Sequence, residues 1–229
     1  MSTTRLIIIG ASGHGREVAD AARVAAAVDP TWTDVYGFVD ESPKLVGTTI
    51  ASLKVFNAPP DGGQDACAGL LGVGYPETKA RIIHRFMNQI ADWPTLIHPH
   101  AVIGDRVSID RGCFIQGGCV LTCDIEISEF VTVNCGATIN HDVRVGRLAT
   151  VSPGAHIGGN VTIGEGAFVG IGASVKQGIT LGEWSVVGAG AAIVENVPAN
   201  AVVGGVPARV IRTRSEGWHL ESQDGLPRD

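Results

Sequence analysis

Aliphatic residues recur at every sixth position through the second half of the chain. From Ile97 to Ile193 each sixth residue is Ile, Leu or Val, and the residue four places later is Ala, Val, Cys, Ile or Ser throughout. A six-residue period of this length predicts a solenoid whose hexads form the sides of three-sided coils, with the aliphatic residue inside and the small residue at the corner. Since no coil buries its inner face alone, the pattern predicts a stacked parallel β-helix.

The repeat also predicts which residues are neighbours. Three hexads complete one coil, so residues eighteen apart stack in columns. Cys123, His141 and Gly159 therefore share one column, and Asp124, Asp142 and Asn160 share the next. Three polar residues at 140–142 interrupt an otherwise regular hexad, which makes this corner a candidate site.

The first 92 residues follow a different pattern. An apolar strand at 6–9 runs into the glycine-rich turn 10–15 and a helix at 16–28. Further strands are predicted at 35–39 and 68–73, and a second helix at 77–89. Strands that alternate with helices indicate a small parallel sheet, so residues 1–92 are predicted to form an α/β domain.

Composition narrows the function classes. The net charge of −6 argues against a nucleic-acid partner, which needs a basic surface. No run of 18 apolar residues and no signal peptide is present, so we expect a cytoplasmic protein without a membrane partner. The five cysteines are odd in number and lack zinc-ribbon spacing, which predicts reduced thiols and no metal site.

The hexads, together with the preceding turn Gly10-Ala-Ser-Gly-His-Gly15, resemble those of the hexapeptide-repeat acyltransferases. More narrowly, the chain is similar to the NeuD- and PglD-like sialic-acid O-acetyltransferases and nucleotide-amino-sugar N-acetyltransferases. The resemblance implies a Rossmann-like domain at 1–92, an all-β left-handed parallel β-helix at 93–212 and a C-terminal tail at 213–229. It also implies a homotrimer with sites between subunits, acetyl-CoA as the donor and a sugar or nucleotide sugar as the acceptor.

Site residues follow from the same resemblance. It implies that His141 is the general base, that Asp142 orients it, and that Asn134 contacts the substrate. Where relatives often have a second histidine for the thioester carbonyl, this chain has Thr150, whose hydroxyl is also a donor. An imidazole suits the base because it is largely neutral at cellular pH.

The resemblance also implies two further groups of ligand-binding residues. The acceptor contacts lie in the first domain, and the pantetheine wall of acetyl-CoA lies along the β-helix. The acceptor group is Ser12, Gly13, His14, Asp40, Glu41 and Gly74; the cofactor group is Thr150, Gly159, Ile171 and Ala189. Tyr75-Pro76 replaces the usual asparagine pair, so an unusual acceptor is expected.

Each assignment has a structural alternative. His141 could be a solvated corner residue, His14 an exposed loop residue, and the glycines turn residues that the hexads need in any case. Arg209 and Arg212 meet coenzyme A phosphates or form a solvated face. The buried positions of Cys113 and Cys119 predict core packing.

The function predicted from the sequence is acetyl transfer from acetyl-CoA to a nucleotide-linked amino sugar, with His141 as general base. The alternative is O-acetylation of a sialic acid or a related sugar. A trimeric nucleotide-sugar-binding scaffold is the non-enzyme alternative. A β-helical zinc hydratase is disfavoured, because His98, His100, His141 and His156 show no pair beside a third imidazole.

Overall fold

The N-terminal domain of the computed structural model is a five-stranded sheet with two helices. The model describes residues 5–60 and 67–220. The sheet has the order β3-β4-β2-β1-β5 and is parallel except for the antiparallel pair β3 and β4. Its elements are β1 (Arg5–Ile9), α1 (Gly13–Val28), β2 (Val35–Val39), β3 (Thr49–Ile50), β4 (Leu53–Phe56), β5 (Cys67–Leu71) and α2 (Pro76–Phe86).

The second domain is the expected left-handed parallel β-helix. Within the described residues its strands form three flat faces, which we call the β12, β13 and β14 faces. The β12 face contains β6 (Leu96–Ile97), β9 (Phe114–Ile115), β12 (Thr132–Val133), β15 (Thr150–Val151), β18 (Phe168–Val169), β21 (Val186–Val187), β23 (Ala201–Gly205) and β24 (Ala208–Thr213).

The other two faces complete each coil. The β13 face contains β7 (Val102–Ile103), β10 (Val120–Leu121), β13 (Thr138–Ile139), β16 (His156–Ile157), β19 (Ser174–Val175) and β22 (Ala192–Ile193). The β14 face contains β8 (Val107–Ile109), β11 (Ile125–Ile127), β14 (Arg144–Val145), β17 (Thr162–Ile163) and β20 (Thr180–Leu181). A final 3-10 turn, η1 (Trp218–Leu220), follows β24.

The hexad residues fill the inside of the coils as predicted. Ile115, Leu121 and Ile139 are fully buried, and so are Cys119 and Val131 from the second inward position. The strand register pairs residues eighteen apart, for example Thr132 with Thr150. This register confirms the predicted columns.

Three sets of turns join the faces. The turns from the β13 face to the β14 face form the His141 corner (123–124, 141–142, 159–160). Those from the β14 face to the β12 face form the Phe130 corner (129–130, 147–148, 165–166, 183–184). Those from the β12 face to the β13 face form the Ile171 corner (135–136, 153–154, 171–172, 189–190).

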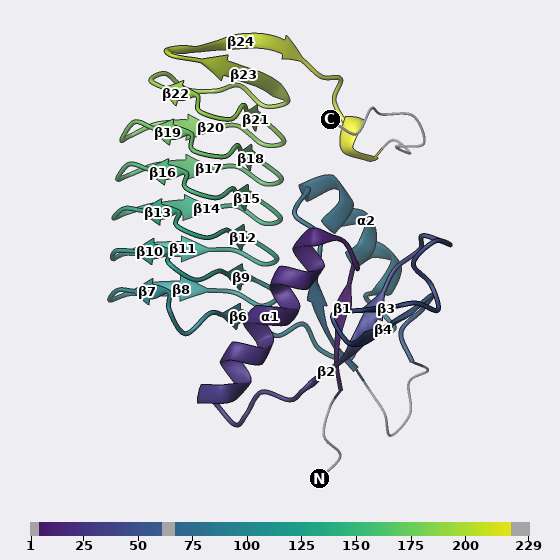
Figure 1. Cartoon of the computed structure of the whole chain (residues 1–229). Coiled ribbons are helices and arrows are strands. Elements are labelled where there is room, and N and C mark those ends of the chain that lie inside the picture. The colour runs from purple at the N-terminus through teal and green to yellow at the C-terminus, as the bar shows by residue number, and fades with distance from the viewer. Residues whose placement is uncertain (1–4, 61–66, 221–229) are drawn as a thin grey trace.

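The N-terminal domain packs on only one side of the β-helix. Figure 1 shows α1 and α2 beside β6, β9, β12 and β15, with the β13 column on the side away from them. One core cluster joins Leu96 and Phe114 to the inner face of α1, and a second joins Phe130, Leu148 and Trp184 to the region of α2. The His141 corner is therefore remote from this chain's own N-terminal domain.

Sequence reasoning missed the β3–β4 hairpin and shifted some element ends. The hairpin strands have two and four residues, too short for a clear alternation. α1 begins at Gly13, three residues before the predicted start, because the glycine turn itself enters the helix. Of the predicted tail at 213–229, residues 221–229 lie outside the described residues.

Candidate active site

The His141 corner presents an oriented imidazole. His141 Nδ1 and Asp142 Oδ2 are 2.8 Å apart, and the two side chains are 63% and 61% exposed. An ionised carboxylate only accepts hydrogen bonds, so Nδ1 donates to Asp142 and the lone pair lies on Nε2. The positive φ of Asp142, 60°, turns the chain so that these adjacent residues meet. The pair has the geometry of a base and its orienting group.

Gly159 lies directly against the imidazole ring. A Cβ at Gly159 would be 2.5 Å from His141 Cε1 and 2.6 Å from Nε2. Such distances are below any real contact, so only glycine lets the ring lie over the next coil. The repeat predicted this column, and the structure brings His141, Asp142 and Gly159 together.

A charged groove borders the His141 corner on the β14 face. The groove has a volume of about 440 Å³ and includes Asp142 and Asn160 in its lining. Two ion pairs flank it: Arg106 contacts Asp124 at 2.6 and 2.8 Å, and Arg144 contacts Glu126 at 3.3 Å. The groove therefore presents a polar, charged surface beside His141.

Asn134 and Thr150 do not lie at the His141 corner. Asn134 is 7% exposed, and its amide donates to Val151 O in the next coil, a stacking bond that Asn140 also makes. Thr150 is 1% exposed, and its hydroxyl donates to Gly74 O at 2.7 Å. This hydroxyl proton is already used inside the chain, which argues against the expected contact with a thioester.

Ile171 and Ala189 lie in a third region, the Ile171 corner. Ile171 is 61% exposed. One chain does not bring this corner to Gly159, because the β13 face separates them. The predicted cofactor wall stays a prediction.

The glycines of the first loop have different roles. Gly10 has a φ of 109°, and a Cβ there would be 2.8 Å from Gly72 O. A Cβ at Gly15 would be 2.1 Å from Gly10 O, so both glycines are needed for the tight packing of α1 on β1. Gly13 is exposed, and its Cβ would meet nothing closer than 3.8 Å. The fold does not explain Gly13, so it is the better candidate for ligand approach.

Ser12 and His14 lie at the N-terminus of α1. Ser12 is exposed and makes no side-chain cap hydrogen bond, although it is the N-cap residue. His14 Nδ1 is 3.1 Å from Glu17 Oε2, its ring lies edge-on to Phe114, and its buried Nε2 has no partner among the described residues. Burial lowers the pKa of His14; Glu17 opposes this shift, and the charge of Lys79 adds to it.

Asp40 and Glu41 line a cavity at the carboxyl edge of the sheet. The cavity has a volume of about 150 Å³, and Gly10 and Arg81 also line it. Asp40 accepts from Ala11 N at 2.9 Å and Ser42 N at 2.8 Å, and Glu41 pairs with Arg85. Ligands of open parallel sheets bind at this edge. The structure brings the loops after β1 and β2 together, while the contacts to a ligand stay a prediction.

Gly74 and Tyr75 follow β5 at the same edge. A Cβ at Gly74 would meet no atom within 4 Å. Tyr75 is 57% exposed and stacks on Phe168 of β18 with ring centroids 5.6 Å apart. The replacement of the usual asparagine pair thus produces an aromatic contact between the two domains.

Lys79 is an interdomain residue that sequence reasoning missed. It is fully buried, and its Nζ donates to Phe130 O, Ala149 O and Thr132 Oγ1. A lysine three residues into a charged amphipathic helix gives no sign of burial, so only the tertiary structure identifies it.

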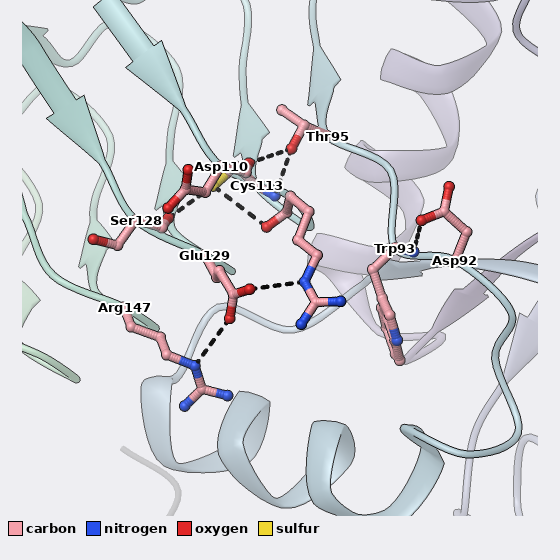
Figure 2. Close-up of polar contacts among 9 residues, drawn as sticks. Asp92, Trp93, Thr95, Asp110, Cys113, Ser128, Glu129 and Arg147 are labelled. Atoms are coloured by element: carbon pink, nitrogen blue, oxygen red, sulfur yellow. Dashed lines mark hydrogen bonds and ion pairs between the residues drawn. The ribbon is translucent and has the colours of Figure 1, made fainter.

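Polar contacts link successive coils of the β-helix at and near the Phe130 corner. Figure 2 shows Glu129 between Arg147 and a second guanidinium, that of Arg111; the nitrogen–oxygen distances are 3.5 and 2.8 Å. Thr95 donates to Asp110 O at 2.5 Å and accepts from Cys113 N at 3.2 Å. Cys113 and Cys119 are 1% and 0% exposed, which confirms their predicted core positions.

The described residues contain neither a metal-binding cluster nor a membrane-spanning helix. Within residues 5–60 and 67–220 no group of three or more His, Cys, Asp or Glu side chains is arranged to hold a metal ion, although the rings of His98 and His100 are 5.1 Å apart. None of the helices in the described part of the chain is long and apolar enough to span a bilayer.

Comparison with known families and structures gives a consistent match. Residues 5–86 match the family model of the PglD N-terminal domain. The acetyltransferase domain of PglB from Neisseria gonorrhoeae, solved with acetyl coenzyme A, is 29% identical with a TM-score of 0.79; the match covers 90% of this chain and 98% of that one. No curated protein sequence matches the chain.

Two further solved structures have the same two-domain fold. WeeI from Acinetobacter baumannii is 27% identical with a TM-score of 0.80, over 91% of this chain and 100% of that one. PerB from Caulobacter crescentus, solved with CoA and GDP-perosamine, is 25% identical with a TM-score of 0.76, over 90% and 96%.

Proposed function

We propose, from the place of this chain among the PglD-like hexapeptide-repeat sugar acetyltransferases, that it transfers the acetyl group of acetyl-CoA to the amine of a nucleotide-linked amino sugar. The observation that carries the proposal is the His141–Asp142 pair, whose free Nε2 lies against the backbone of Gly159. A base beside a backbone N–H provides both groups that acyl transfer to an amine requires.

The reaction follows from this geometry. The neutral amine attacks the thioester carbonyl, and a C–N bond forms while His141 Nε2 takes the amine proton. The Gly159 N–H, for which no described residue is an acceptor, donates to the oxyanion of the tetrahedral intermediate. The C–S bond then breaks, and the imidazolium returns its proton to the leaving thiolate of CoA. Asp142 stabilises the imidazolium between these steps.

The acceptor is bound by the N-terminal domain. The open backbone at Gly13, the N-terminus of α1 and the 150 Å³ cavity at Asp40 and Glu41 lie at the carboxyl edge of the sheet. A helix N-terminus and an approachable glycine suit a phosphate, and the carboxylates suit sugar hydroxyls. This combination favours a nucleotide sugar over a free sialic acid.

A homotrimer completes the site. The acceptor domain covers the β12 face, whereas His141 projects from the opposite corner of the same chain. A second copy supplies His141 to the acceptor domain of the first, and three copies close the arrangement. The exposed Ile171 corner of one copy then lies beside the Gly159 column of another, where it contributes to the pantetheine wall.

Thiol release from acetyl-CoA with a panel of acceptors tests the activity. Nucleotide-linked 4-amino sugars are expected to be turned over, while sialic acids and neutral nucleotide sugars are not. If sialic acids alone were turned over, the reaction would be ester formation and the proposed amide formation would be wrong. Binding of a nucleotide sugar without thiol release would leave the chain a scaffold and overturn the enzyme proposal.

Mixing two variants with complementary defects, at an acceptor concentration far below the KM of Gly13→Val, tests the shared site. Gly13→Val blocks the backbone approach to a phosphate and should raise the acceptor KM with little change for acetyl-CoA, whereas Ala27→Val at the far end of α1 should not. After subunit exchange between Gly13→Val and His141→Ala trimers, about a quarter of the sites should combine two intact halves. No recovery after verified exchange would show that each site belongs to one chain.

A further inference from the structure

The burial of Lys79 in α2 is anomalous. Lysine is almost never fully buried unless it is paired, because a charge loses its hydration in the interior. In the part of the chain that the structure describes, Lys79 is the one charged side chain that is buried, and it is 0% exposed. None of its hydrogen-bond acceptors carries an opposite charge, so no ion pair offsets this loss. Stability alone therefore does not account for a lysine here.

The contacts of Lys79 all cross between domains. Its ammonium has three donors, and three acceptors receive them: Phe130 O at 2.9 Å, Ala149 O at 3.0 Å and Thr132 Oγ1 at 3.3 Å. These acceptors belong to two successive coils of the β-helix, next to the Phe130 corner. Directional bonds of this kind hold α2 at one position and one rotation on the coils.

A second bond fixes the other end of the same segment. Thr150, adjacent to Ala149, donates its hydroxyl proton to Gly74 O at 2.7 Å. Gly74 lies between β5 and α2, and Lys79 lies in the second turn of that helix. Residues 74–79 are thus held at both ends by neighbouring residues of one coil. This segment forms part of the carboxyl edge where the acceptor is proposed to bind.

We propose that Lys79 is a positioning residue which, together with Thr150, locks segment 74–79 of the acceptor domain onto the β-helix. The inference rests on the proposed function, because the lock sets the place of the acceptor amine relative to the base supplied by another copy. Transfer needs the reacting atoms about 3 to 3.5 Å apart, and a 1 Å error costs about 10²-fold in rate. The lock converts two packed domains into one rigid frame.

The test compares Lys79→Met and Thr150→Val with Lys54→Met, a matched change of an exposed lysine in the same domain. Lys79→Met should lower kcat/KM for the acceptor by about 10²-fold and leave the KM for acetyl-CoA within about twofold. The melting temperature should change little, since removal of the buried charge offsets the loss of its hydrogen bonds to the three acceptors. Thr150→Val should produce a smaller loss of the same kind, and Lys54→Met none.

Hydrogen exchange supplies a readout that needs no acceptor. Amides in segment 74–79 should exchange faster in Lys79→Met than in Lys54→Met, with the β-helix strands unchanged. Equal exchange and equal acceptor kinetics in the two variants would overturn the inference. The inference would also be overturned if Lys79→Met lowered the melting temperature and impaired the kinetic constants for both acetyl-CoA and the acceptor. That result would show that Lys79 is merely a structural residue. If the wild-type chain acylates no acceptor, the proposed function fails, while exchange still decides whether Lys79 holds the segment.

Discussion

The His141 corner and the Phe130 corner arise from the same repeat but have opposite character. Both place non-glycine residues at positive φ, near 60°, in several coils. At the His141 corner these are the polar residues Asp124, Asp142 and Asn160. At the Phe130 corner they are Phe130, Leu148 and Trp184, with Gly166 at the same turn position between the last two. Asn and Asp tolerate this conformation, whereas bulky residues are strained in it.

Burial accounts for the strained corner. Phe130 is 0% exposed and packs edge-on to Trp93 with ring centroids 5.7 Å apart, and Trp184 stacks on His219 of η1 at 3.6 Å. Contact with α2 and η1 offsets the backbone strain at this corner. Among residues 5–60 and 67–220 nothing covers the His141 corner in this way, and the side chains of His141 and Asp142 are exposed. The comparison shows that hexads specify the coils, while the outward corner residues decide between docking and chemistry.

The largest expected effect breaks the His141 corner. His141→Ala should lower kcat by about 10²- to 10⁴-fold, because the transfer loses its general base, with the trimer and coenzyme binding intact. Asp142→Asn should lower kcat less, since the imidazole remains but loses its charged partner. Steady-state kinetics with a saturating acceptor measures both. A nearly full rate in His141→Ala would show that another residue is the general base, and His14 would be the next candidate.

The next largest expected effect is the loss of stability when the Phe130 corner loses its aromatic ring. Phe130→Ala should reduce the free energy of unfolding by about 3 to 5 kcal/mol, because it removes a buried ring and keeps the strained φ. The matched change Asn160→Ala, at the same turn position of the exposed corner, should cost only about 1 to 2 kcal/mol. Urea unfolding at one fixed protein concentration measures both. Equal losses would show that cover by α2 does not distinguish the corners.

A further expected effect is the pH response of the Phe130 corner. Burial lowers the pKa of Lys79 to about 7. The charges of Cys113 and Glu77 oppose this shift, and the side chain of His14 faces Lys79 from α1. Between about pH 7 and the ordinary lysine pKa, the unfolded chain binds a proton that the native chain has lost. The free energy of unfolding should therefore rise with pH across this range.

Lys79→Met is the control for that response. The difference in unfolding free energy between wild type and Lys79→Met should change with pH above 7 and be constant below it. A difference that stays constant from pH 6 to pH 10 would contradict the assigned burial cost of Lys79.

Much of the fold and part of the site were predictable before the structure. Each hexad is a local signal, and a fixed period of eighteen residues converts chain position into spatial columns. The neighbourhood of His141, Asp142 and Gly159 followed from that arithmetic, as did the buried positions of Cys113 and Cys119. The short β3–β4 hairpin was missed, because strands of two and four residues are too short for a clear alternation.

What the sequence by itself determined is everything that the period encodes: the coils, their inward residues and the stacked column of the His141 corner. Only the tertiary structure decided which face the N-terminal domain covers, and with it the burial of Lys79 and the bond from Thr150 to Gly74. The physical reason is that packing between the domains joins residues about 50 to 75 positions apart in the chain. These interdomain contacts follow no repeating spacing in the sequence, so no pattern predicts them. A repeat reports the contacts between its own units, whereas domain docking depends on the shape of both surfaces.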